Sequence, residues 1–209
     1  MQKTLDEKIA RILKDSGVSD FILADAKDAD MGFGIAAPGV QGNSSDGVAR
    51  FHSIETYRQN MREIVQQGLV DIMLMSVSTS EILTIEERLF DDSAVTPAIR
   101  ANDTSDIWLG ESGDYKNQPS LPFQTITLDH AQCGKSFCSP EERSLGVDLG
   151  LYSITFNNDA ILDREALQEY AVFRIEAEEA EFRHFLEVFV PNAPGSRTPQ
   201  DTGRFVNDS

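Results

Sequence analysis

The sequence is poor in cysteine and lacks long apolar runs. Only two cysteines, Cys133 and Cys138, occur among 209 residues, which is too few for the disulfide framework of a small secreted protein. No segment approaches the roughly 20 consecutive apolar residues that span a bilayer. Residues 1–17 form an amphipathic pattern rather than the apolar block of a signal peptide. These absences predict a cytoplasmic protein that does not bind membranes.

Basic residues are also scarce. Eighteen Lys and Arg stand against 35 Asp and Glu, which gives a formal net charge of −17. A field of that sign repels phosphate backbones and anionic lipids, so we expect no nucleic-acid or membrane partner. The acidity is interpreted as a device for solubility. The expected partner is a small-molecule substrate.

Short apolar segments alternate with helical ones along the chain. Residues 70–77 are almost continuously apolar, which is typical of a parallel strand covered on both faces. The pattern predicts five strands, at residues 21–25, 70–77, 94–102, 147–156 and 186–191. Strands that alternate with helices indicate a parallel α/β sheet with right-handed crossovers. We expect one domain over residues 1–209, with an insertion at about 103–137.

Three local predictions concern the connections between the strands. Residues 125–130 alternate like an exposed strand, and Ser139 with Pro140 opens a short helix that ends at Gly146. A long helix is expected at about 163–185. The apolar stripe that should face the sheet in this helix consists of Leu167, Ala171, Ile175, Glu178, Phe182 and Phe185.

Two architectures accommodate these units. A doubly wound sheet of five strands would be complete at this length. A (β/α)8 barrel needs eight units and typically about 250 residues. On that reading the chain would hold about five strand–helix units of an incomplete barrel.

The segment FILADAKDADMGFG, together with the later YRQNMREIVQQGLVDIMLMS, resembles the start of class I aldolase-like barrels. This superfamily includes deoxyribose-phosphate, tagatose-bisphosphate and archaeal-type fructose-bisphosphate aldolases. The resemblance continues loosely through VDLGLYSITF and LEVFVPNAP and covers most of the chain. It implies an α/β fold of the TIM-type (β/α)8 barrel class, here incomplete, and a carbon–carbon lyase as the complete enzyme.

The resemblance also implies a chemistry. Such enzymes form a Schiff base between a lysine on the sixth strand and a small carbonyl substrate, which in many cases carries phosphate. Asp25 occupies the position of the assisting acid on the first strand, and Asn192 lies near an aromatic proton donor of several relatives. Lys27 is the one lysine beside the expected active face, but neighbouring acids favour its protonated, non-nucleophilic form. The expected catalytic candidates are therefore Asp25, Lys27 and Asn192, and the fragment by itself is expected to be inactive.

Four polar residues near predicted strand ends are candidates for substrate binding. They are Ser76, Arg100, Asn102 and Asn157. Function in barrels lies at the carboxyl ends of the strands, and a guanidinium there suits a phosphate or carboxylate. The alternative is that strands simply become polar where they leave the core.

Several motifs fall short of a cofactor or metal site. Three acids within residues 25–30 could bind a divalent cation, but a solvated turn is the preferred interpretation. Residues 32–37 match the glycine pattern G-x-G-x-x-A of dinucleotide-binding sites, but they lack the strand–turn–helix context that such a site requires. His130, Cys133 and Cys138 supply only three irregularly spaced zinc-type residues. We therefore expect neither cofactor nor metal.

Two further functions stay open on the sequence alone. A complete open-sheet protein could bind an anionic small molecule at its strand ends. Alternatively, a non-enzymatic protein could recruit another chain through unpaired edge strands. A barrel that stops after five units leaves such edges, so homo-oligomers or association through sheet edges are expected.

Overall fold

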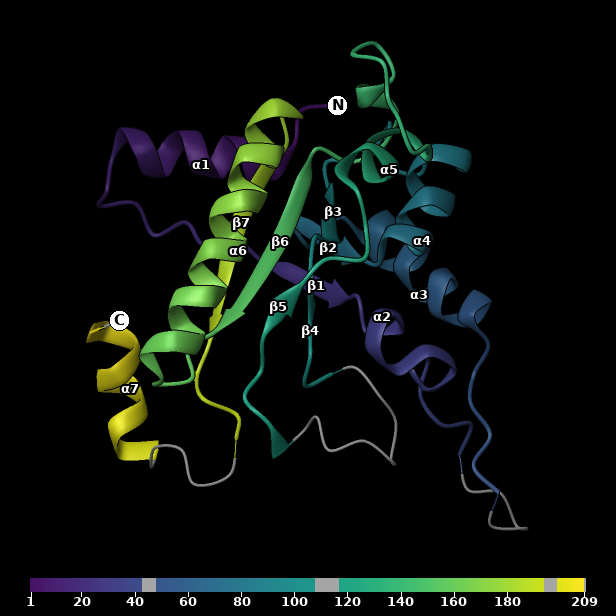
Figure 1. Ribbon diagram of the computed structural model, residues 1–209. Coiled ribbons are helices and arrows are strands. Elements are labelled where there is room, and N and C mark those ends of the chain that lie inside the picture. Colours follow the sequence, from purple (N-terminus) through teal and green to yellow (C-terminus); the bar gives the residue numbers. More distant parts are fainter. Residues whose placement is uncertain (43–47, 108–116, 194–198, 209) are drawn as a thin grey trace. The chain divides into compact units, whose positions relative to one another are not determined.

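The computed structural model is a mixed α/β fold that divides into two compact units (Figure 1). The first unit comprises residues 1–99 and 129–148, and the second comprises residues 100–128 and 149–209. The structure describes residues 1–42, 48–107, 117–193 and 199–208. In this part of the chain no helix is both long enough and apolar enough to cross a membrane.

Three parallel strands form the sheet of the first unit: β1 (Ala24–Lys27), β2 (Ile72–Met75) and β3 (Thr96–Arg100). All side chains of β2 and β3 are buried. β1 begins three residues later than predicted, because the N–H of Leu23 donates to the carboxylate of Asp71 (2.8 Å). Regular pairing with β2 therefore starts at Ala24.

Helix α3 (Ile54–Gln67) covers one face of this sheet. Its predicted ends are confirmed: the Ser53 hydroxyl accepts from the N–H of Thr56, and Gly68 ends the helix with a φ of 65°. The core of the first unit comprises Tyr57, Met61, Val65, Met73, Met75, Leu83, Phe90 and Val95. The side chains of Met73 and Met75 thus point to the α3 side of β2.

Helix α1 (Thr4–Lys14) is tied to the chain that leads into β3. Leu5 is its buried residue, and the ammonium group of Lys3 donates to three carbonyl oxygens, those of Phe90, Ser93 and Val95, at 2.7 to 3.0 Å. Partial burial lowers the pKa of Lys3. Lys8 adds an ion pair with Asp71 at 2.6 Å. These contacts hold the amphipathic helix on the amino-terminal side of the strands.

The remaining helical segments of the first unit are short. They are α2 (Asp30–Phe33), the 3-10 turn η1 (Gly34–Ala36), α4 (Val77–Ser80) with the π-helical turn η2 (Glu81–Glu86), α5 (Leu128–Cys133) and the 3-10 turn η4 (Arg143–Leu145). Two predictions were wrong here. Residues 128–130 open α5 rather than extending a strand, and the segment from Ser139 forms turns with η4 in place of a helix.

A disulfide joins Cys133, the last residue of α5, to Cys138. Helix α5 is also bound to the chain that leads into the next strand, because Gly146 N–H donates to Gln132 O (2.7 Å) and Val147 N–H to Ala131 O (3.2 Å). A Cβ atom at Gly146 would lie 2.3 Å from the Ala131 carbonyl oxygen. The close approach of the two backbones therefore requires glycine at this position.

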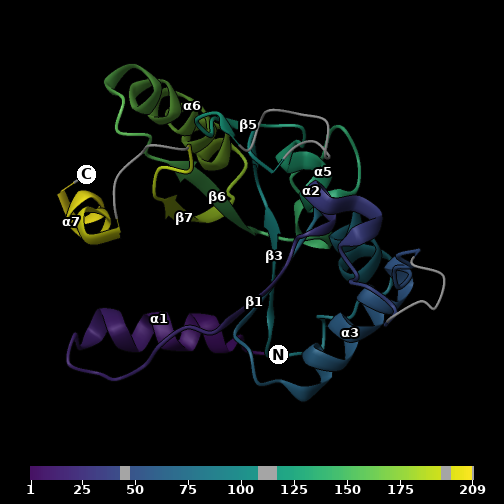
Figure 2. The same cartoon turned by 90° about the horizontal axis from the view of Figure 1, so that it is seen from below.

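The second unit is built on the parallel pair β6 (Leu149–Thr155) and β7 (Arg183–Phe189). Helix α6 (Ala160–Glu179) lies along this pair (Figures 1 and 2), and a two-residue antiparallel pair, β4 (Asp103–Thr104) with β5 (Pro122–Phe123), lies near it. Helix α7 (Pro199–Asp208) follows β7. The predicted insertion is thus divided, since residues 103–128 belong to the second unit and residues 129–137 to the first.

The predicted inward stripe of α6 was wrong by about one residue. The buried positions in the helix are Ala166, Phe173 and Ala177, each no more than 1% exposed, whereas Leu167 and Ile175 are 46% and 61% exposed. Phe173 packs against Tyr152 of β6 with ring centroids 4.6 Å apart. The aromatic contact fixes the rotation of the helix and leaves Leu167, Ala171, Ile175 and Glu178 exposed. The helix also ends at Glu179 rather than at about 185, so Phe182, which is buried, and Phe185 of β7 lie beyond it.

The strands follow one another in consecutive order, as predicted. β3 passes into the second unit at Arg100, and the next N–H, that of Ala101, donates to Leu151 O of β6 (2.8 Å). The hydrogen-bonded order is β1-β2-β3-β6-β7. No reversal of direction in this order occurs among the described strands, which is consistent with an incomplete α/β barrel.

Candidate functional site

Asp25 and Lys27 form an ion pair on β1, with Lys27 Nζ 3.1 Å from Asp25 Oδ1. Strand register pairs Asp25 with Met73 and Lys27 with Met75. Because neighbouring residues of parallel strands point to the same side, both charged side chains lie on the face that α3 covers. The structure therefore brings two of the expected catalytic residues together, on the helix-covered face of the sheet.

Asp30 lies where β1 and β2 end, and it accepts two hydroxyl hydrogen bonds through one oxygen. Ser76 Oγ donates to Asp30 Oδ2 at 2.6 Å, and Thr79 Oγ1 donates to the same atom at 2.9 Å. Ser76 also caps α4 by accepting from the N–H of Thr79 (3.2 Å). Asp30 Oδ1 is buried and has no partner in the described part of the chain. Ser76 thus acts in a cluster with Asp30, which the sequence pattern indicated only as one of three possible cation ligands.

Tyr57 projects from α3 toward the same acids. Burial raises the pKa of its hydroxyl to about 12, with further contributions from the negative charges of Asp30, Asp28 and Asp25. The phenol therefore stays protonated at neutral pH and serves as a hydrogen-bond donor. The end of β1 and β2 accordingly combines one orphaned carboxylate oxygen with several hydroxyl groups.

The side chains of Arg100 and Asn102 form hydrogen bonds within the second unit. Arg100 Nε donates to Asn102 O (2.9 Å), and the Arg100 side chain is buried. The Asn102 amide donates to Ser153 O (2.8 Å) and accepts from Ser153 N–H (2.7 Å), so it extends the strand pairing with β6 through a side chain. Both residues lie at the carboxyl end of β3, as expected, but their observed partners belong to the protein.

Asn157 and Asn192 both hold the segment around Ser120. Asn157 Nδ2 donates to Ser120 O (2.9 Å), and Asn192 Oδ1 accepts from Ser120 N–H (2.9 Å). Asn192 Nδ2 also donates to Gln118 O (2.9 Å). Asn157 Oδ1 is buried without a partner among the described residues. The structure brings these two candidates together around one loop, where they fix its backbone.

Sequence reasoning missed a polar pair on the β6–β7 sheet. Ser153 Oγ donates to Glu187 Oε2 at 2.8 Å, and the two residues are direct strand partners. Tyr152 points to α6, so the alternation of a strand places Ser153 and Glu187 on the opposite face. Ser153 is fully buried and Glu187 is half-buried. A charged residue in the middle of the apolar segment LEVFV was the available signal.

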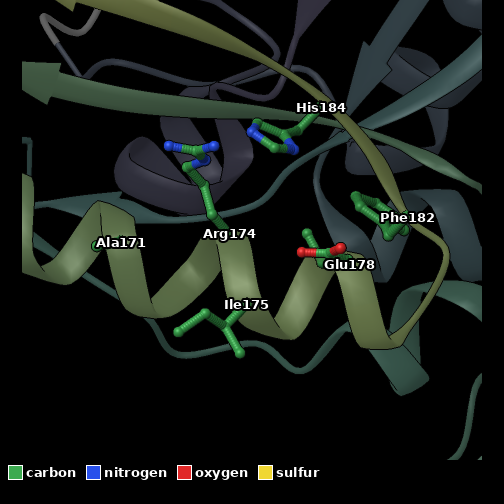
Figure 3. Close-up of a pocket in the computed structure, with 7 residues that line it drawn as sticks. Ala171, Arg174, Ile175, Glu178, Phe182 and His184 are labelled. Carbon is green, nitrogen blue, oxygen red and sulfur yellow. The ribbon is translucent and has the colours of Figure 1, made fainter.

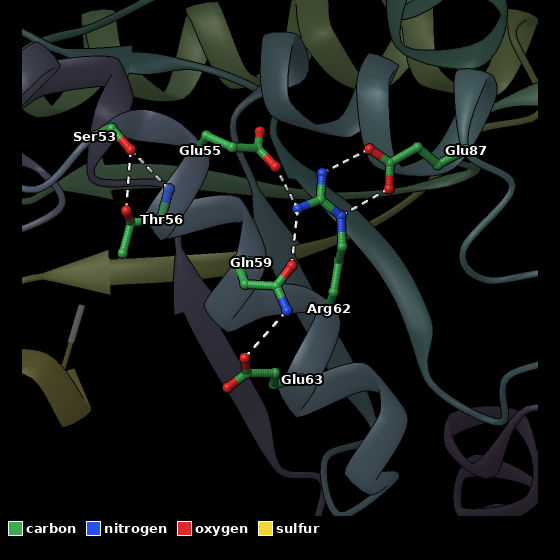
Figure 4. Close-up of polar contacts among 7 residues, drawn as sticks. All are labelled: Ser53, Glu55, Thr56, Gln59, Arg62, Glu63 and Glu87. Atoms are coloured by element: carbon green, nitrogen blue, oxygen red, sulfur yellow. Dashed lines mark hydrogen bonds and ion pairs between the residues drawn. The ribbon is translucent and has the colours of Figure 1, made fainter.

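The charged cluster on α3 is structural (Figure 4). Arg62 binds both carboxylate oxygens of Glu87, at 2.8 and 2.6 Å, and reaches Glu55 at 2.7 Å. The Arg62 hydrogen bonds lower the pKa of Glu87. These side chains join α3 to the end of η2 on the exposed side of the helix.

The residues considered for metals have other partners. His130 Nε2 lies 3.1 Å from Glu81 Oε2, and both cysteines are in the disulfide. Across the described ranges, no group of three His, Cys, Asp or Glu side chains is arranged to hold a metal ion. Of the acids in residues 25–30, Asp25 is instead in the Lys27 ion pair and Asp30 is in the Ser76 cluster.

The fold defines the chain as an α/β protein with a parallel sheet. No known protein family matches it, and no curated protein is significantly similar to it. The aldolase-like resemblance therefore depends on the sequence segments that carry it and on the order of the strands in the sheet.

Proposed function

We propose that this chain forms five strand–helix units of a TIM-type (β/α)8 barrel in a class I aldolase-like enzyme. The enzyme would cleave or form a carbon–carbon bond in a small carbonyl substrate, with or without a phosphate group. The consecutive strand order carries the proposal. Successive strands are neighbours in a TIM barrel, whereas a doubly wound sheet reverses at a switch point.

The chemistry requires a lysine outside the described residues. A neutral amine attacks the substrate carbonyl, and loss of water gives the imine that weakens the adjacent carbon–carbon bond. Lys27 does not suit this role, because its ammonium group is held in an ion pair with Asp25 on the helix-covered face of the sheet. We therefore assign Lys27 and Asp25 to the structure of β1 rather than to the bond-making step.

Proton transfer is assigned to Glu187. In a barrel, helices cover the outer face of the sheet and catalytic side chains lie on the inner side. A residue on the face of the sheet opposite α6 would therefore point toward the substrate. Glu187 meets this condition, and the Ser153 hydroxyl orients one of its oxygens. Asp25 does not meet it, because its side chain shares the α3 face with Met73. Asn192 is assigned to holding the backbone of the Ser120 segment and not to proton transfer.

Borohydride trapping tests the proposal. Protein expressed from the complete gene is incubated with dihydroxyacetone phosphate, glyceraldehyde 3-phosphate or pyruvate, reduced, and mapped by mass spectrometry. We expect a covalent adduct on a lysine other than Lys27. Glu187→Gln should slow adduct formation by roughly 100-fold or more if the carboxylate moves the proton, whereas Glu165→Gln, on an exposed turn of α6, should not. Absence of any adduct would refute the aldolase assignment, and an adduct on Lys27 would refute the assigned roles.

The non-enzymatic alternative has one observation in its favour. Strand β7 exposes apolar side chains, with Leu186, Val188 and Phe189 each about 40% accessible. A protein that recruits another chain at this position would show such a surface without any Schiff-base chemistry. The trapping experiment separates the two functions, because only the enzyme forms a reducible adduct.

A further inference from the structure

Helix α6 carries two apolar stripes, and only one of them is used inside the second unit. The inner stripe consists of Ala166, Phe173 and Ala177, which are buried against β6 and β7. The outer stripe consists of Leu167, Ala171 and Ile175 at i, i+4 and i+8, and all three are exposed. A helix with apolar residues on two sides is expected to be covered on both.

A groove lies along the carboxyl-terminal half of α6 and includes Ala171 and Ile175 of the outer stripe (Figure 3). It has a volume of about 430 Å³ and is lined by Ala171, Arg174, Ile175, Ala177, Glu178, Phe182 and His184. Leu186 and Val188 lie on the same face of β7 as His184, because they follow it at intervals of two residues. They are 40% and 38% exposed, so the apolar floor continues along the strand. Contiguous apolar surface of this kind marks an interaction site.

The charges in the groove are self-complementary. Arg174 and Glu178 lie one helical turn apart, and neither side chain has an ion-pair or hydrogen-bond partner in the part of the chain that the structure describes. The Arg174 guanidinium lies over the Tyr170 ring, 5.9 Å from its centroid. In an antiparallel pair of identical helices, position 174 of one copy meets position 178 of the other, and the reverse contact follows from the two-fold symmetry.

We propose that a second copy of this chain occupies the groove, with the two α6 helices antiparallel and two reciprocal Arg174–Glu178 ion pairs. In this register Ile175 of each copy lies opposite residue 177 of the other, so the contact covers the carboxyl-terminal half of α6, which lines the groove. Near the Arg174–Glu178 pairs the helix–helix contact excludes water, which strengthens ion pairs that would contribute little at an open surface. This inference does not rest on the aldolase-like function.

Sedimentation velocity of the 209-residue chain over a concentration series tests the proposal. We expect a species of twice 23.1 kDa. Arg174→Glu and Glu178→Arg, made singly, each place like charges opposite one another and should weaken the dimer by at least roughly tenfold. The double variant with both changes restores two opposite-charge pairs and should dimerise like the wild type.

Glu179→Arg is the matched control, because it makes the same charge change one residue outside the groove. It should leave the dimer intact, and circular dichroism should show equal helix content in all four variants. A wild-type chain that stays monomeric would overturn the proposal, because no second copy would then occupy the groove. A dimer insensitive to Arg174→Glu, or a double variant that remains monomeric, would overturn it equally.

Discussion

Strands β2 and β7 are both apolar and both parallel to their neighbours, yet their burial differs. Met73 and Met75 of β2 are completely buried, whereas Leu186, Val188 and Phe189 of β7 are 38% to 43% exposed. β2 has a strand on each side and α3 over one face, while β7 is the last strand in the hydrogen-bonded order. Position in the sheet, rather than composition, decides how much an apolar strand contributes to stability.

The largest expected effect comes from the same substitution at a buried site of the first unit and at an exposed site of the second. Both sites lie outside β2 and β7 but test the same dependence on burial. Leu83→Ala removes a side chain with no solvent exposure from the first core and should cost about 2–5 kcal/mol in the free energy of unfolding. Leu167→Ala removes a side chain that is 46% exposed and should cost less than about 0.5 kcal/mol. Urea unfolding followed by circular dichroism measures both. Equal losses would mean that the outer stripe of α6 is covered within one chain.

Reduction of the disulfide should affect the first unit. Cys133 and Cys138 are five positions apart in the sequence, and cross-linking a loop of that size contributes about 2 kcal/mol through the entropy of the unfolded chain. Dithiothreitol should therefore lower the unfolding free energy by about that amount. The Cys133→Ser/Cys138→Ser variant provides the control, since it should not respond to the reductant. An unchanged wild-type transition in dithiothreitol would contradict the expectation.

Loss of the Ser153 hydroxyl should have a moderate effect in the second unit. Ser153→Ala leaves Glu187 Oε2 without its donor at a half-buried position and should cost about 1 kcal/mol. Ser153→Thr retains a hydroxyl and serves as the comparison, although its added methyl group enters a fully buried site. Thermal unfolding can rank the two variants. If Ser153→Ala is as stable as the wild type, the hydrogen bond does not hold Glu187 in place.

The smallest expected effect is a pH dependence in the first unit. Arg62 lowers the pKa of Glu87 in the folded chain, so the unfolded chain binds the proton more tightly. The resulting stabilisation is present above the ordinary glutamate pKa of about 4.3 and is lost as pH falls through the lower folded value. Because Glu87 is 34% exposed, we expect only about 0.5–1 kcal/mol. Stability curves of the wild type and Glu87→Gln should converge in acid, and parallel curves would exclude the contribution.

The fold could be predicted largely from local pattern, whereas the site could not. Ser53 and Gly68 mark the ends of α3 correctly, because capping is decided by residues within one turn. The site depends on which face each strand residue occupies. Asp25 lies at the end of an apolar segment, but its pairing with Met73 turns it toward α3. Glu187 was overlooked because its partner Ser153 is 34 residues away in sequence.

The sequence by itself determined the acidic surface, the alternation of strands and helices, and the strand order that follows from right-handed crossovers. The tertiary structure decided the rotation of α6, where the contact between Phe173 and Tyr152 selected one of two apolar stripes. It also decided that Arg100 and Asn102 bind the backbone of their own unit. Periodicity within a segment fixes its type, but only contacts between distant segments fix which of its faces is buried.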